Sequence, residues 1–200
     1  MSTTPQRQIG IVLFDGVEEL DAIGPWEVLS YWIHEYPDDG FAVFTLSPEG
    51  GLVQCIKGLR VLADYSFADA PAVEVLLHPG GRGTRPLLRD AAYLDWVQRQ
   101  RATVPLLTSV CTGSLVYAAA GLLAGRPATT HWSDLEELAG LDPTIQLRPD
   151  DRFVDDGDVV TAAGVSAGID MALHLVARLA GVERARQVRR GIQYDPRPPV

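Results

Sequence analysis

The sequence predicts an α/β fold in which a mostly parallel central sheet is sandwiched between helices. Short runs rich in Val, Ile and Leu, such as residues 9–14 and 104–110, alternate with longer segments of helical period. Uninterrupted apolar runs of this length are typical of parallel strands, which are buried on both faces. The chain has 200 residues, of which 46% are hydrophobic, and this is enough for one well-buried core. We therefore expect a single domain that spans residues 1–200.

The individual elements follow from length, branching and turn residues. Strands are expected at residues 9–14, 41–46, 73–77, 104–110 and 159–162. Lys57-Gly58 permits a chain reversal within residues 52–65, which predicts a hairpin added to the sheet. Pro25 suits the first turn of a helix that runs to about His34. Further helices are expected at residues 86–101, 113–123 and 134–141 and from Ser166 onward, and the proline-rich segment 196–200 is expected on the surface.

Net charge and cysteine content exclude several classes of protein. A formal charge of −9 and a pI near 4.8 argue against binding to nucleic acid or to an anionic membrane, because both require clustered Lys and Arg. The basic residues near the C-terminus have helical spacing and are expected on a solvated helix face: Arg184, Arg186, Arg189 and Arg190. Two cysteines cannot form a disulfide framework, and we expect no leader and no membrane-spanning segment. These observations predict a cytoplasmic protein.

Cys111 lies where an apolar strand ends and a helix of small residues begins. The surrounding sequence is Thr108-Ser109-Val110-Cys111-Thr112-Gly113-Ser114. A tight turn here would push the side chain outward, and unpaired backbone N–H groups at the helix start would favour the thiolate. The thiolate is the nucleophilic form of cysteine, so this position indicates a cysteine-dependent enzyme. The alternative is that Cys111 is a small buried hydrophobic residue, as most free cysteines are.

Two other loops are expected beside Cys111, because the carboxyl ends of parallel strands gather at one edge of a sheet. One loop carries Glu18, Glu19 and Asp21, and the other is the turn Gly80-Gly81. An acid, a thiol and closely approaching backbone amides would supply a proton donor, a nucleophile and oxyanion donors. The sequence therefore predicts a reaction centre at this edge of the sheet.

Each candidate also has a structural interpretation. Glu18 and Glu19 fit a solvated acidic turn better than a catalytic role. For Asp21 the sequence leaves two roles open, which are the cap of the following helix and chemistry. His131 is a candidate base toward Cys111, but its start-of-helix context favours a structural role.

Cofactor and metal motifs are missing from the sequence. Gly81-Arg82-Gly83 lacks the third glycine of a dinucleotide fingerprint, and there is no phosphate-binding loop and no zinc-ligand spacing. His78 and His174 lie on apolar stretches and are expected to be structural. We therefore expect chemistry that uses no cofactor and no metal.

Several segments together resemble the ThiJ/PfpI superfamily. They are Glu19-Leu20-Asp21, Pro79-Gly80-Gly81, Ser109-Val110-Cys111-Thr112-Gly113-Ser114, Ala128-Thr129-Thr130-His131-Trp132 and Ala163-Gly164-Val165-Ser166-Ala167-Gly168. The match runs from Ile9 to about Tyr194 and is most similar to the isocyanide hydratase branch. Sensor domains of AraC-type transcription activators carry similar Cys-Thr-Gly and Thr-Thr-His-Trp segments. Those activators continue into a helix-turn-helix domain, whereas this acidic chain stops at Val200, so a regulator is not expected.

The resemblance implies a flavodoxin-like, class I glutamine amidotransferase-like fold and a role for individual residues. Cys111 would be the nucleophile and Asp21 the acid facing it, where many superfamily members have glutamate. Thr112 would belong to the catalytic set, in place of the histidine of the protease and chaperone branches, which argues against peptidase chemistry. The residues against the substrate would be Gly80, Gly81, Val165 and His131, with the backbones of Gly81 and Thr112 as oxyanion-type donors. Dimers are usual in this family, so a homodimer is expected.

The activity implied by the resemblance is the cofactor-free addition of water to an isocyanide, a small-molecule substrate. A thioimidate on Cys111 would be hydrolysed to an N-substituted formamide. Two alternatives stay open at this point. One is a glyoxalase- or deglycase-like reaction on 2-oxoaldehydes, in which His131 would matter as a base. The other is a redox-sensing stress protein whose thiol is oxidised instead of turned over.

Overall fold

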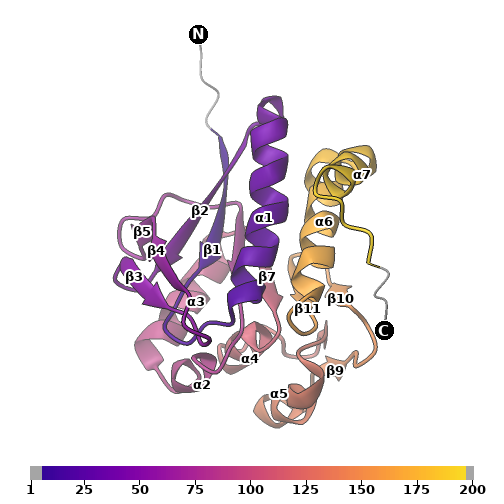
Figure 1. Cartoon of the computed structure of the whole chain (residues 1–200). Helices are drawn as coiled ribbons and strands as arrows, with labels where there is room; N and C mark the ends of the chain where they lie inside the picture. Colours follow the sequence, from indigo (N-terminus) through magenta and orange to yellow (C-terminus); the bar gives the residue numbers. More distant parts are fainter. Residues whose placement is uncertain (1–5, 197–200) are drawn as a thin grey trace.

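Residues 6–196 are described by a computed structural model whose centre is a seven-stranded sheet (Figure 1). The strand order is β10-β11-β7-β6-β1-β2-β5, and every neighbouring pair is parallel except β10 and β11. The strands of this sheet are β1 (Arg7–Val12), β2 (Phe41–Ser47), β5 (Tyr65–Ser66), β6 (Val75–His78), β7 (Leu106–Val110), β10 (Phe153–Asp155) and β11 (Val159–Ala162). Two smaller sheets pair β3 (Gly51–Gln54) with β4 (Arg60–Ala63) and β8 (Pro127–Ala128) with β9 (Gln146–Leu147).

Helices cover both faces of the sheet, so the predicted α/β fold is confirmed. The α-helices are α1 (Glu19–Glu35), α2 (Thr84–Leu87), α3 (Ala91–Thr103), α4 (Gly113–Ala119), α5 (Leu135–Leu141), α6 (Ala167–Ala180) and α7 (Val182–Gly191), and the 3-10 helices are η1 (Pro37–Asp39) and η2 (Trp132–Asp134). Figure 1 shows α1, α6 and α7 together in front of the sheet, with α3 and α4 behind it. Of the predicted surface segment 196–200, residues 197–200 lie outside the described residues.

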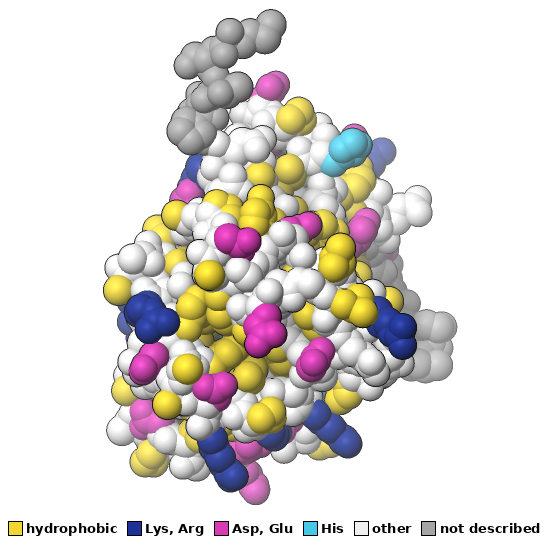
Figure 2. Space-filling model, turned by 90° about the vertical axis from the view of Figure 1, so that its left-hand side faces the viewer, with side chains coloured by type: hydrophobic (Ala, Val, Ile, Leu, Met, Phe, Trp, Pro, Cys, Tyr) yellow, Lys and Arg dark blue, Asp and Glu magenta, His cyan; other side chains and the backbone are white. Residues whose placement is uncertain are grey.

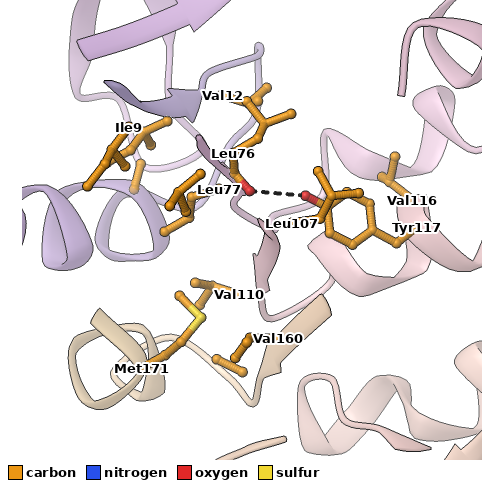
Figure 3. Packing of buried hydrophobic residues seen from close by; sticks show 14 of the residues in the cluster. Ile9, Val12, Leu76, Leu77, Leu107, Val110, Val116, Tyr117, Val160 and Met171 are labelled. Carbon is orange, nitrogen blue, oxygen red and sulfur yellow. Dashed lines mark hydrogen bonds between the residues drawn. The ribbon is translucent and has the colours of Figure 1, made fainter. Parts of the chain in front are cut away.

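The core is centred on β1, β6 and β7, whose side chains are buried on both faces of the sheet (Figure 3). Leu76, Leu77 and Leu107 are each at most 1% exposed. Met171 of α6 and Tyr117 of α4 reach this core from helices on the two faces, and the Tyr117 hydroxyl lies 3.4 Å from the Leu76 carbonyl oxygen. Full burial of one leucine contributes about 2 kcal/mol. These strands therefore form a stable frame for the loops at their ends.

The first helix begins earlier than predicted. α1 starts at Glu19, with Glu18 as its N-cap residue, and Pro25 lies inside the helix instead of in its first turn. An internal proline lacks the N–H that would reach the carbonyl of Asp21, which costs about 3 kcal/mol. Packing offsets this cost, because Pro25 is buried and lies directly against Gly168 of α6. The longer helix places Asp21 within its first turn.

The predicted hairpin is present, but the prediction that it extends the main sheet is wrong. β3 and β4 pair antiparallel in a sheet of their own, and β5 takes the edge position beside β2. Gly50 and Gly51, with φ of 74° and 77°, turn the chain away after β2. Leu52 and Leu62 lie opposite each other on the hairpin and are 64% and 70% exposed. Figure 2, which faces this side of the molecule, shows hydrophobic side chains gathered between scattered charged ones.

Two other helices are shorter than predicted. The expected helix 86–101 is divided into α2 and α3, because the Asp90 side chain accepts hydrogen bonds from the N–H groups of Ala92 (3.0 Å) and Tyr93 (3.1 Å) and begins α3. The expected helix 113–123 ends as α4 at Ala119, two residues before Gly121 adopts a φ of 75°.

Three observations concern partners and ions. No helix in residues 6–196 is long and apolar enough to cross a membrane. Within the same range, no cluster of three or more His, Cys, Asp and Glu residues is arranged to hold a metal ion. In the C-terminal basic cluster, Arg184 is engaged internally, because its Nε donates to Asp39 Oδ2 (2.7 Å).

Candidate active site

Cys111 forms a sharp turn between the carboxyl end of β7 and the start of α4. Its φ is 55°, in the left-handed region that is strained for a side chain other than glycine. Hydrogen bonds hold this strained backbone: the Cys111 N–H faces the carbonyls of Ala162 and Ala163 (3.1 Å each), and its carbonyl accepts from the hydroxyls of Ser114 (3.1 Å) and Thr130 (2.9 Å). The predicted sharp turn between strand and helix (the elbow) is therefore present, whereas the residue at its tip, which was expected to point outward, is buried.

The Cys111 sulfur lies in a protected environment, and the residue is 6% exposed. Burial raises the pKa of the thiol, and the nearby charge of Asp21 raises it further. The backbone N–H groups of Thr112 and Val165 lower the pKa by less. The sequence favoured a thiolate on the strength of the helix start alone; the structure shows that burial and the neighbouring acid outweigh this effect. A thiolate here needs a proton acceptor close by.

Asp21 is the acid beside the thiol, and it is fully buried. Its Oδ2 accepts a hydrogen bond from the N–H of Gly80 (3.0 Å), whereas Oδ1 has no hydrogen-bond partner among the described residues. Burial raises the pKa of Asp21, and the charge of Glu18 contributes to the same shift. Because Asp21 follows the N-cap by three residues and bonds to another loop, its interpretation as a helix cap is wrong.

The glycine turn after β6 connects the acid to the elbow. Gly80 donates to Asp21, and the N–H of Gly81 donates to the hydroxyl of Thr112 (2.9 Å). The Thr112 hydroxyl also lies 3.2 Å from the Gly81 carbonyl oxygen. The prediction that Gly81 offers a free N–H to the substrate therefore differs from the structure, in which this donor is occupied. Thr112 joins the turn to the nucleophile loop.

Gly81 has no room for a side chain. Its φ is 120°, and a Cβ would lie 2.5 Å from the carbonyl oxygen of Gly16 and closer still to the N–H of Glu18. Gly81→Ala is therefore expected to lower the free energy of unfolding by about 3 kcal/mol, because the turn must move. Urea denaturation measures this change, with Gly140→Ala as the control, since a Cβ at Gly140 of α5 meets nothing within 4 Å. Equal stability of the two variants would contradict this interpretation of the turn.

The pocket over Cys111 has a volume of about 340 Å³. It is lined by the three loops at this edge of the sheet, by Ile56 of the hairpin and by His131 and Val165. A larger groove of about 420 Å³ lies over Tyr93 and Trp96, but its lining contains no cysteine. The chemistry of the lining, not the volume, therefore indicates the site.

Glu18 and Glu19 do not form the expected solvated turn. Their side chains are 16% and 17% exposed, and both pair with Lys57 at the tip of the hairpin. The Lys57 N–H also donates to Glu19 Oε1 (2.6 Å). These contacts fasten the hairpin to the start of α1, which brings Ile56 to the rim of the pocket.

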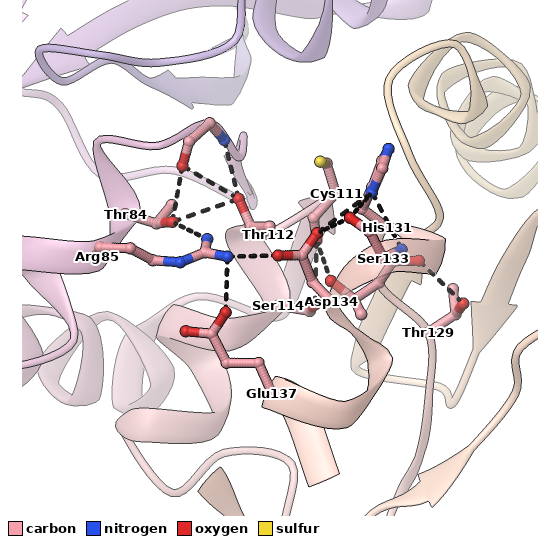
Figure 4. Close-up of polar contacts among 12 residues, drawn as sticks. Thr84, Arg85, Cys111, Thr112, Ser114, Thr129, His131, Ser133, Asp134 and Glu137 are labelled. Atoms are coloured by element: carbon pink, nitrogen blue, oxygen red, sulfur yellow. Dashed lines mark hydrogen bonds and ion pairs between the residues drawn. The ribbon is translucent and has the colours of Figure 1, made fainter. Parts of the chain in front are cut away.

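His131 also lines the pocket, and its side chain is part of a polar network (Figure 4). Its Nδ1 is 2.8 Å from the hydroxyl of Ser133 and 3.2 Å from Asp134 Oδ2, and the Ser133 hydroxyl donates to the same carboxylate (2.8 Å). Arg85 forms ion pairs with Asp134 and with Glu137 (2.6 Å). His131 therefore has defined partners in addition to its position beside the site.

The residues of this network were not predicted from the sequence. Arg85 and Asp134 are 49 positions apart, so no local pattern connects them. The one signal was the hydroxyl and the acid that directly follow Trp132 in Thr-Thr-His-Trp-Ser-Asp. The two apolar-stretch histidines behave as predicted: His78 is buried with Nε2 at 2.9 Å from the Tyr93 hydroxyl, and His174 Nε2 lies 2.6 Å from Asp155.

Comparison with known proteins places this architecture in a family. Residues 7–178 match the model of the DJ-1/PfpI family. The chain belongs to the DJ-1/PfpI family. The isonitrile hydratase of Pseudomonas putida is 42% identical to it over 193 residues, which are 96% of this chain and 80% of that protein. The crystal structure of a ThiJ/PfpI family protein from Pseudomonas syringae superposes with a TM-score of 0.88 at 32% identity, covering 99% of this chain and 79% of the other.

Transcriptional regulators are also similar to this chain. The HTH-type transcriptional regulator GbdR of Pseudomonas aeruginosa is 32% identical over 152 residues, which are 76% of this chain but 41% of the regulator. This chain therefore spans less than half of the regulator and most of the hydratase. Family membership fixes the fold, and the function must be argued from the site.

Proposed function

We propose that this member of the DJ-1/PfpI family is a hydratase of isocyanides, also called isonitriles, with Cys111 as its nucleophile. The observation that carries the proposal is the pairing of the Cys111 thiol, which lines the pocket, with the buried carboxyl of Asp21 next to it. The 42% identity with an isonitrile hydratase supports the substrate class. The route uses side chains of the protein and water.

In the proposed first half-reaction, the sulfur of Cys111 adds to the terminal carbon of the isocyanide. A C–S bond forms, one C–N π bond breaks, and the carbon takes the proton of Asp21. The product is a neutral thioimidate, in which the former terminal carbon carries sulfur, hydrogen and the C=N bond. The raised pKa of Asp21 suits this step, because a carboxyl that keeps its proton near neutral pH is available as an acid.

In the second half-reaction, water adds to the thioimidate carbon. The C–S bond then breaks, its electron pair returns to sulfur, and an N-substituted formamide leaves. Overall, one isocyanide and one water give one formamide, and the thiol and the carboxyl are restored.

The hydrogen bonding of Gly81 favours this reaction over acyl transfer. Attack on a carbonyl creates an oxyanion that requires free donors. Attack on an isocyanide with proton transfer to carbon gives a neutral intermediate, so no oxyanion forms in the first half-reaction. The N–H of Gly81 is already bonded to Thr112, which fits the second case.

The test is product identification with the purified protein. Incubation with cyclohexyl isocyanide or phenyl isocyanide is expected to yield the matching formamide, detected by liquid chromatography and mass spectrometry. Methylglyoxal under the same conditions is expected to remain unconverted. Turnover of methylglyoxal without turnover of either isocyanide would overturn the proposal in favour of 2-oxoaldehyde chemistry.

A further inference from the structure

We propose that His131 is the base that activates water in the second half-reaction, and that Ser133 and Asp134 are positioning residues that orient its ring. This role rests on the proposed hydratase function and assigns the hydrolysis of the thioimidate to the part of the pocket lined by His131. It concerns residues that the first half-reaction does not use.

The contacts of Nδ1 determine which nitrogen of His131 carries the proton. Two acceptors face Nδ1: the Ser133 oxygen at 2.8 Å, whose own hydrogen is given to Asp134, and Asp134 Oδ2 at 3.2 Å. One donor, the Ser133 backbone N–H, faces it at the longer distance of 3.3 Å. A carboxylate and a hydroxyl oxygen together favour the proton on Nδ1. The neutral ring then keeps a lone pair on Nε2, as a base requires.

The ring is held in a fixed orientation over the site. Gly164 lies directly against the imidazole, and a Cβ at this glycine would overlap the ring carbon Cδ2. The next residue, Val165, places its N–H against the sulfur of Cys111. Figure 4 shows Nδ1 directed into the Ser133–Asp134 contacts and the other ring nitrogen directed away from them, on the side where the sulfur lies. His131 and Val165 both line the pocket that contains Cys111, and the proposed role directs the lone pair of Nε2 toward it.

Asp134 is itself anchored, which makes the orientation stable. Arg85 forms an ion pair with Asp134 and a second one with Glu137 of α5. The Asp134 side chain is 16% exposed, so solvent screens these contacts only in part. The acid, the hydroxyl and the imidazole thus lie in an order like that of a catalytic triad, in which the acid holds the ring tautomer.

The two protons of the attacking water go to separate acceptors, His131 and Asp21, and the hydrolysis therefore balances. After the first half-reaction Asp21 is a carboxylate. Water adds to carbon as its first proton moves to Nε2 of His131, and this proton then passes to the imidate nitrogen. The second proton of the water returns to Asp21 as the C=O bond forms and the C–S bond breaks. The formamide thus gains C–H from Asp21, and oxygen and N–H from water.

The experiment separates the two half-reactions by intact-protein mass spectrometry during turnover of cyclohexyl isocyanide. The wild-type protein is expected to show product and little adduct. His131→Gln is expected to form the adduct on Cys111 in a burst of one equivalent and to hydrolyse it about 100-fold more slowly. His131→Ala is expected to behave in the same way, with partial recovery of hydrolysis on addition of imidazole. A merely structural role for His131 would give neither the adduct nor the recovery.

Asp134→Asn tests the positioning residues, and Glu136→Gln is the matched control because Glu136 is an exposed acid at the start of α5 that takes no part in the ion pairs of Arg85 or His131. Asp134→Asn is expected to slow adduct hydrolysis about tenfold with the rate of adduct formation unchanged. Glu136→Gln is expected to match the wild-type protein in both steps. Identical behaviour of the two variants would overturn the role of Asp134.

Failure of this inference and failure of the proposed function give different results. Wild-type turnover together with unchanged hydrolysis in folded His131→Gln overturns the role of His131 and leaves the hydratase proposal standing. If the wild-type protein forms neither formamide nor adduct from any isocyanide, the hydratase proposal fails and the inference fails with it. Circular dichroism of each variant establishes that it is folded.

Discussion

Replacement of Cys111 by alanine is expected to abolish both isocyanide turnover and the covalent adduct, while the fold is retained. The thiol supplies the only bond to substrate in the proposed route, so no slower version of the same chemistry remains. The loss of one buried sulfur from a residue held by five backbone and hydroxyl contacts is expected to change the free energy of unfolding by about 1 kcal/mol. Product analysis and thermal denaturation measure the two effects separately.

The pH dependence of turnover by the wild-type protein provides a second test of the pair formed by Cys111 and Asp21. Burial raises the pKa of Asp21 to about 7, and burial together with the Asp21 charge raises the pKa of the Cys111 thiol. The thiol and carboxyl titrate as a pair, and the reactive form has lost one proton of the two. Turnover is therefore expected to rise between about pH 6 and pH 8 as the first proton leaves, with no decline until strongly alkaline pH.

Cys55 provides the control for the prediction that Cys111→Ala loses turnover and the adduct. It is the other cysteine, it is buried in the hairpin region, and it lies outside the residues that line the pocket. Cys55→Ala is expected to keep turnover and the adduct on Cys111. Retained turnover in Cys111→Ala, or an adduct that maps to Cys55 instead, would refute the assignment of the nucleophile.

Asp21→Asn is expected to reduce turnover by a factor of about 100 or more and to stabilise the protein at the same time. Asparagine has nearly the same shape, so its oxygen still accepts from the N–H of Gly80. It cannot deliver a proton to the isocyanide carbon or accept the thiol proton. Loss of rate with the fold preserved separates a chemical role from a structural one.

The sign of the stability change follows from the raised pKa of Asp21. In the unfolded chain this carboxyl ionises near pH 4, whereas in the folded protein it keeps its proton up to about pH 7. The folded state therefore binds more protons across this window, and its stability falls as the pH rises through it. Asparagine does not ionise, so the Asp21→Asn variant avoids this loss of stability at high pH. The variant is expected to be more stable than the wild-type protein by about 2 kcal/mol at pH 8, with little difference at pH 4.

Urea denaturation of both proteins at pH 4, 6 and 8 measures this divergence. A stability difference that does not change with pH would show that Asp21 is ionised in the folded state, against the burial argument. A variant that keeps the wild-type turnover would remove Asp21 from the proposed mechanism. The two measurements are independent, so either part of the prediction can fail alone.

The sheet and its order of elements were accessible from the sequence because they depend on local signals. Uninterrupted apolar runs predicted β1, β2, β6, β7 and β11 to within a few residues. The errors arose where packing between distant segments overrides local preference. Pro25 is a helix starter by its ring geometry, but burial against Gly168 keeps it inside α1. The three-residue strand β10 has too short a pattern to be recognised.

The site was predicted in part for the same reason. The edge rule for parallel strands predicted that the loops of Cys111 and Asp21 lie together, and it left the role of Asp21 open. The raised pKa of Asp21 and of the Cys111 thiol could not be predicted, because both depend on burial that no local pattern encodes. The partners of His131 were also missed, because Arg85 reaches Asp134 from another loop.

The glycines around the pocket limit how this protein can diverge. Addition of one carbon at each of these positions would overlap backbone or ring atoms within 3 Å: Gly80, Gly81, Gly83, Gly113 and Gly164. These five positions therefore favour glycine, whereas Ile56 and Arg82 line the pocket and are exposed. New substrate preferences can evolve by exchange of these outer side chains while the elbow of Cys111 is inherited intact.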